Sequence, residues 1–75
     1  MGKLSGVTYR VLSKKLRGFG FVFFREAKGS HEIWFNETTE RYTTIPRHTG
    51  DMVEGTVRSI LKQAGIEIED FLNVR

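Results

Sequence analysis

The sequence predicts an α+β fold in which two helices cover one face of a three-stranded antiparallel sheet. Apolar residues recur with the helical period near both ends of the chain, at residues 9–19 and 57–64. The segment between them holds three short runs rich in β-branched and aromatic residues. At 75 residues the chain has room for one small core, so we expect residues 1–75 to form a single domain.

The first helix is expected to begin after Ser5, which can cap it, and to end near Gly18. Apolar side chains share one stripe of the helical wheel, namely Tyr9, Leu12, Leu16 and Phe19. Cationic side chains line another side, namely Arg10, Lys14 and Arg17. One side is therefore expected to pack on the sheet while the other meets solvent or a phosphate backbone.

Three strands are expected next, at residues 21–25, 31–35 and 42–45, joined by turns at 27–30 and 36–40. Neighbouring strands should pair as antiparallel hairpins, and Pro46 should end the third strand. In the second strand Ile33 and Phe35 share one face, and His31 has the same parity.

The chain is expected to end with a helix near residues 56–64 and a short helical turn at residues 68–72. The buried face of this helix is predicted to consist of Val57, Ile60, Leu61 and Ala64. Gly65 is placed to stop it in a left-handed conformation. Arg58 and Lys62 lie four residues apart on another face, where they can contact a polyanion.

The composition excludes several classes of protein. A hydrophobic content of 39% with a single proline is typical of a folded domain and not of a disordered tail. Because there are no cysteines, we expect no disulfide framework, thiolate nucleophile or cysteine zinc site. No apolar stretch has the length of a membrane span or a signal peptide, so we expect a cytoplasmic protein with no membrane partner.

Positive charge is concentrated in the first third of the chain. Residues 1–25 hold six basic residues and no acid, which gives +6, although the net charge of the whole chain is +3. Residues 26–75 hold six basic and nine acidic residues, which gives −3. The N-terminal third is thus a candidate surface for RNA, with a solvated helix face as the ordinary alternative.

Residues 17–24, which read Arg-Gly-Phe-Gly-Phe-Val-Phe-Phe, match the ribonucleoprotein-1 pattern of RNA-binding sheets. Aromatic side chains of that pattern stack on bases. In an RNA-recognition motif, however, this segment forms the third strand, and the sixteen residues before it cannot supply the earlier elements. A helix-ending glycine followed by a core strand is the simpler interpretation, and a non-catalytic RNA-binding module is the alternative function.

His31 is the candidate catalytic residue, because it follows Lys28, Gly29 and Ser30 in a turn. A glycine lets the backbone approach a phosphate, and a lysine offers it charge. An imidazole there can deprotonate a ribose 2′-hydroxyl that then attacks the adjacent phosphate. The competing interpretation places His31 at the edge of the core, since its parity groups it with apolar residues.

Other cofactor and metal chemistry finds no support in the sequence. His48 lies in a loop, where we expect solvent exposure, and it is 17 residues from the other histidine, with no cysteine to complete a zinc site. The glycines at 18 and 20 are not followed by the third glycine of a dinucleotide loop, and there is no Walker lysine.

Three ordered blocks of the sequence, residues 28–34, 43–48 and 55–65, together resemble the HicA family of messenger-RNA-cleaving toxins. The resemblance covers about residues 5–72 and implies a fold like the double-stranded-RNA-binding domain. It also implies ribonuclease activity without a metal or cofactor, catalysis by the histidine of the glycine-serine-histidine block, here His31, and a HicB-type antitoxin that covers this region.

We therefore expect an RNA endonuclease toxin of a type II toxin-antitoxin pair, acting on messenger RNA. Lys28, Gly29 and Ser30 would hold the scissile phosphate, and Arg58 and Lys62 would contact the RNA backbone from the second helix. A further hypothesis is an adaptor whose basic helix docks on an acidic partner.

Overall fold

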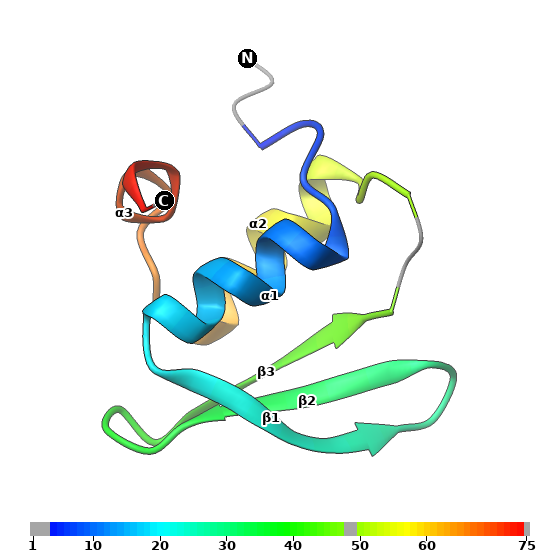
Figure 1. Ribbon diagram of the computed structural model, residues 1–75, viewed down its shortest axis with the longest axis vertical. Coiled ribbons are helices and arrows are strands. Elements are labelled where there is room, and N and C mark those ends of the chain that lie inside the picture. Colours follow the sequence, from blue (N-terminus) through cyan, green and yellow to red (C-terminus); the bar gives the residue numbers. More distant parts are fainter. Residues whose placement is uncertain (1–3, 48–49, 75) are drawn as a thin grey trace.

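The computed structural model describes residues 4–47 and 50–74. Its elements are α1 (Tyr9–Gly18), β1 (Phe21–Ala27), β2 (His31–Asn36), β3 (Arg41–Pro46), α2 (Glu54–Ala64) and α3 (Ile68–Asn73). Both α1 and α2 lie on the same side of the sheet, and no described element covers its other face (Figure 1). The predicted α+β class, the order of the elements and the short C-terminal helix are confirmed.

The sheet is antiparallel with β2 at its centre. At one end of β2, His31 lies between Ala27 of β1 and Pro46 of β3, whereas at the other end Asn36 lies beside Arg41. Both hairpins therefore have the expected order. The turn before His31 and the turn before Arg41 occupy opposite ends of the sheet, about 17 Å apart for five residues of extended strand.

The central strand separates two unlike faces. Its residues that point toward the helices are all buried, and these are Glu32, Trp34 and Asn36. The apolar residues Ile33 and Phe35 are only half-buried on the open face, which His31 shares in an exposed position. A place for His31 at the edge of the core is therefore wrong, because the core is built on the alternate residues of this strand.

The first helix begins three residues later than its sequence suggests. Thr8 is the N-cap, and its side-chain oxygen accepts the backbone N–H of Val11 at 3.2 Å. Residues 4–6 form a turn before it, and the Met52 N–H donates to Val7 O at 2.8 Å. Gly6 has a φ of 77°, which a continuing right-handed helix does not allow. The chain buries Leu4 and Val7 in the core in this conformation, so the helix does not extend to Ser5.

One core holds the layers together, and the predicted buried face of α2 is confirmed within it. Its largest fully buried side chains are Trp34, Phe21, Phe71, Leu4, Leu12, Leu16, Ile45, Leu61 and Val57. Phe71 brings α3 into this core, with Ile68 and Leu72 partly buried beside it. The described residues include no helix long and apolar enough to cross a membrane.

Gly65 ends α2 as predicted, with a φ of 73°. A Cβ atom at this position would lie only 2.7 Å from Nε of Arg41. The backbone conformation therefore disfavours a side chain here, and the flexible, exposed Arg41 side chain would have to move aside for one.

We expect Gly65→Ala to lower the free energy of unfolding by about 1 to 2 kcal/mol, because alanine is strained at positive φ. Gly55→Ala is the matched control in the same helix, since a Cβ there meets open space. It should be neutral or stabilising by up to about 1 kcal/mol. Urea unfolding followed by circular dichroism measures both, and equal stability of the two variants would contradict the expectation.

Candidate functional site

The turn between β1 and β2 is held in an unusual conformation. Gly29 has a φ of 75° and Ser30 has a φ of 62°, so two successive residues lie in the left-handed region. For a serine this conformation costs about 1 kcal/mol. The Arg47 N–H donates to Ser30 O at 2.9 Å and ties the turn to the end of β3. Glu40 in the other hairpin turn has a similar φ of 59°, so this conformation shapes the turn and does not by itself indicate function.

The imidazole of His31 is exposed and oriented by this turn. Its Nδ1 lies 3.1 Å from the carbonyl oxygen of Lys28. A carbonyl oxygen only accepts hydrogen bonds, so this contact selects the form in which Nδ1 carries a proton. In the neutral ring, Nε2 is then left with a lone pair that can accept a proton. The ring also stands beside Gly29, where a Cβ atom would lie 3.5 Å from Nδ1.

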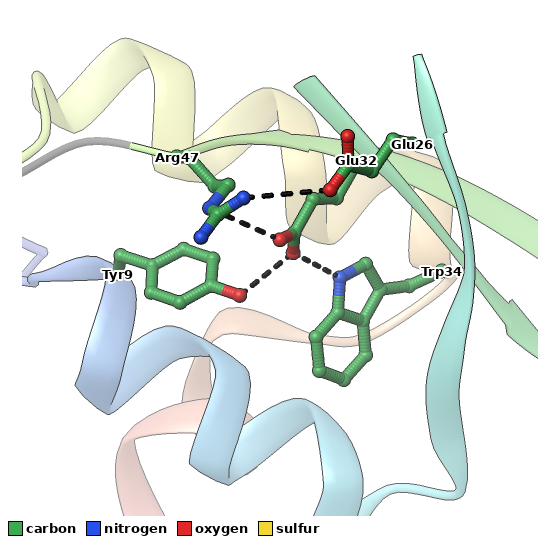
Figure 2. Close-up of polar contacts among 5 residues, drawn as sticks. All are labelled: Tyr9, Glu26, Glu32, Trp34 and Arg47. Atoms are coloured by element: carbon green, nitrogen blue, oxygen red, sulfur yellow. Dashed lines mark hydrogen bonds and ion pairs between the residues drawn. The ribbon is translucent and has the colours of Figure 1, made fainter. Parts of the chain in front are cut away.

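A buried carboxylate lies on the other side of the strand, directly after His31. The Tyr9 hydroxyl donates to Glu32 Oε1 at 2.7 Å, and the Trp34 indole N–H donates to the same oxygen at 2.9 Å. Arg47 Nε lies 3.4 Å from Glu32 Oε2 (Figure 2). We call these four residues the Glu32 cluster. The Glu32 side chain is only 7% exposed, so its charge is tolerated because three donors surround it.

Arg47 connects the Glu32 cluster to the turn. Its guanidinium contacts Glu32 and also Glu26, at 3.5 Å, while its backbone N–H holds Ser30. Sequence reasoning about function missed Tyr9, Glu32 and Arg47. The available signal was a glutamate between His31 and Trp34 in a strand, because a charged residue at a core-facing position requires partners.

The predicted site residues fall into two separate groups. Lys28, Gly29, Ser30 and His31 lie together in the turn, and the Lys28 side chain is exposed there. Arg58 and Lys62 instead line a hollow of about 410 Å³ together with Arg41. Because Arg41 lies at the opposite end of the sheet from His31, Lys62 and Arg58 do not contribute to the turn.

The cations of α1 are also divided. Arg10, Lys14 and Arg17 are exposed, and Arg17 also lies over the Trp34 ring, with 5.0 Å from its guanidinium carbon to the ring centroid. Lys15 donates to Phe71 O at 3.0 Å and so holds α3. All three cations of the predicted line are therefore exposed, and Arg17 also contacts a ring of the core.

Residues 4–47 and 50–74 contain no group of three or more histidine or carboxylate side chains that could hold a metal ion. His48, the second histidine of the sequence, lies outside the described residues.

Burial, followed by the hydrogen bond to Glu32, raises the pKa of Tyr9 above its ordinary value of 10.0. The folded state therefore keeps this proton at a pH where the unfolded chain loses it. The resulting stabilisation is complete below about pH 10 and is lost as the pH rises through the folded-state value. Tyr9→Phe should remove this part of the alkaline destabilisation and lower stability at neutral pH by about 1 to 3 kcal/mol.

Urea unfolding at neutral pH and above pH 10, with phenolate absorbance as a second signal, measures this effect. Tyr42→Phe on the open face is the control, since it leaves the Glu32 cluster intact. If Tyr9→Phe and Tyr42→Phe change stability and its pH dependence equally, Tyr9 does not hold the buried carboxylate.

The chain was also compared with known proteins. A family model described as the HicA toxin of bacterial toxin-antitoxin systems matches residues 9–66, from the start of α1 to just beyond α2. This segment includes the turn, His31, and both Arg58 and Lys62. No curated protein matches the chain. Since the family model spans well over half of the sequence, the resemblance is confirmed, and the chain belongs to the HicA toxin family of bacterial toxin-antitoxin systems.

Proposed function

We propose that this toxin is a metal-independent RNA endonuclease that cleaves messenger RNA with His31 as its general acid and base. The observation that carries the proposal is the exposed imidazole whose Nδ1 contacts the Lys28 carbonyl, so that Nε2 is the nitrogen that can accept a proton in the neutral ring. An ammonium group lies on the same turn, at Lys28, where it can stabilise negative charge that develops on a phosphate. The chain belongs to a toxin family, so we propose that cleavage of messenger RNA arrests translation.

The proposed reaction follows from this arrangement. Nε2 of His31 takes the proton of a ribose 2′-hydroxyl, and the 2′-oxygen attacks the adjacent phosphorus. The bond between phosphorus and the 5′-oxygen breaks, and that oxygen receives a proton from the imidazolium. The products are an RNA ending in a 2′,3′-cyclic phosphate and an RNA beginning with a 5′-hydroxyl.

The rest of the turn would bind the scissile phosphate. At Gly29 the missing side chain lets a phosphate approach the backbone, and the Ser30 hydroxyl can donate to a phosphate oxygen. Arg47 acts as a positioning residue, because it links the turn to Glu32. Arg58 and Lys62, which line a hollow with Arg41, would contact flanking phosphates and not the scissile one.

A toxin of this family works with an antitoxin. We propose a HicB-type antitoxin that covers the His31 turn, and a cytoplasmic location where messenger RNA is accessible. A carboxylate placed on Lys28 by the antitoxin would occupy the site of the substrate phosphate, so that neutralisation and substrate binding compete.

His31→Ala is expected to lower RNA cleavage by about 100-fold or more, because no other group of the turn replaces the lost base. Circular dichroism should be unchanged, since the ring is exposed. Cleavage of labelled RNA by the purified protein and growth inhibition in cells measure the effect. Lys14→Ala, on the exposed side of α1, is the control and should cut normally. A His31→Ala protein that cuts RNA at the wild-type rate would falsify the assignment.

Ser30→Gly separates function from stability. Glycine relieves the strain at a φ of 62°, so we expect the fold to gain about 1 kcal/mol while RNA cleavage falls, because the hydroxyl is lost. Glu40→Gly is the matched control, since Glu40 has a φ of 59° in the turn at the other end of the sheet. Glu40→Gly should give the same gain in stability, about 1 kcal/mol, and should leave RNA cleavage unchanged. If both variants cleave equally well, the Ser30 hydroxyl takes no part in binding the phosphate.

A further inference from the structure

The open face of the sheet carries a cluster of aromatic rings. Phe35 and Tyr42 have ring centroids 4.5 Å apart, and Phe24 lies 6.0 Å from the first and 5.5 Å from the second. Phe24 is 52% exposed and Tyr42 is 50% exposed. Exposed aromatic rings grouped on one face are typical of a binding surface.

A β-bulge brings Phe24 to this face. Phe23 pairs with Trp34 and Arg25 pairs with Ile33, so Phe24 is the extra residue of β1. Phe21 is buried, and Phe23 has an edge contact with Trp34 on the helix side. The ribonucleoprotein-1 pattern therefore does not present its aromatics in the usual alternation, and Phe24 is the phenylalanine of this segment that joins the aromatic cluster.

Charge is divided between the two faces of the sheet in the same way. Both acidic residues of the three strands, Glu26 and Glu32, lie on the helix side, where they contact Arg47. The register places Arg25 and His31 on the open face with the aromatic rings. The open face of β1, β2 and β3 thus combines aromatic rings with cationic or protonatable groups and no carboxylate.

We propose that this face binds unpaired bases of single-stranded RNA, with the bases stacked on Phe24 and Tyr42 and the backbone leading to His31. The inference deepens the proposed nuclease function and rests on it. Phe35 is four residues from His31 along β2, about 14 Å, which a short run of unpaired nucleotides spans. Bases in a double helix are already stacked on one another, so the face selects single strands.

Continuity and charge favour RNA over a protein as the occupant. The aromatic cluster and the proposed catalytic imidazole share one surface, and the charge of that surface complements phosphates. Arg25 stands beside Ile33 between the cluster and the turn, where it can contact the backbone between a stacked base and the scissile bond.

Binding is tested with the full chain carrying His31→Ala, so that the RNA stays intact. Fluorescence anisotropy would compare a labelled single-stranded RNA with the same sequence in a duplex. Phe24→Leu and Tyr42→Leu keep apolar bulk but remove the π-face. Each is expected to weaken single-strand binding by about tenfold, whereas Val22→Ala, an exposed aliphatic change on the same face, should have little effect.

A second measurement guards against misfolded variants. In the His31→Ala protein with its aromatic cluster intact, ring-proton NMR signals of Phe24 and Tyr42 should shift when a 2′-O-methyl tetranucleotide is added. Unshifted rings, or leucine variants that bind single-stranded RNA as tightly as the parent, overturn the proposal. The proposal is also overturned if the leucine variants still bind RNA but no longer bind a co-expressed antitoxin or no longer self-associate. The face would then be a protein interface.

These outcomes are distinguishable from a failure of the nuclease function itself. If wild-type protein cuts RNA and the leucine variants cut it at the same efficiency, His31 remains catalytic and the aromatic cluster is not a base platform. If wild-type protein neither binds nor cuts RNA, both proposals fail together. Cleavage that is lost only in the leucine variants at low RNA concentration, with the same maximal rate, supports the base platform.

Discussion

The Glu32 carboxylate lies inside the contact between the sheet and α1, where a charge without partners is costly. Donors from three elements surround it: Tyr9 at the start of α1, Trp34 within β2, and Arg47 after β3. A shift of β2 by one residue would turn Glu32 and the fully buried Trp34 to the open face and His31 toward the helices. Burial of Trp34 favours the observed facing, and the donors around Glu32 make it compatible with a buried carboxylate, so that the imidazole occupies the open face.

The same interaction reaches the proposed active site through Arg47. Its side chain is fixed by two carboxylates, and its backbone N–H holds the carbonyl of Ser30 in the strained turn. Arg47 thus has two roles: its backbone N–H binds the Ser30 carbonyl, and its guanidinium balances the charge of Glu32. The carboxylates Glu26 and Glu32 therefore lie on the helix side with Arg47, while the proposed catalytic His31 lies on the open side.

The order of elements and the buried face of α2 followed from the sequence, because helical periodicity is a local signal. The start of α1 did not, since Val7 pairs with Met52, far along the chain. The local sequence pattern also could not show which side of β2 points toward the helices. Ile33 and Phe35 make one face more apolar by count, yet the other face is buried because it carries Trp34 and because Tyr9 and Arg47 are available to Glu32.

The candidate site was predictable in part for the same reason. Residues 28–31 are contiguous, so one motif identified them, and the family resemblance pointed to them as well. Lys62 and the turn were grouped by the sequence because both carry positive charge, but strand direction places them at opposite ends of the sheet. The bulge that exposes Phe24 depends on the pairing of two strands and has no signature within β1 alone.

The chemistry of the RNA ends gives the most direct test of the central claim, that an imidazole on this turn activates a ribose hydroxyl. Purified toxin should leave a 2′,3′-cyclic phosphate on one fragment and a 5′-hydroxyl on the other, and a single 2′-deoxy substitution at the cleaved position should stop the reaction. Fragments with 5′-phosphate ends, or undiminished cleavage at a deoxyribose, would contradict the account.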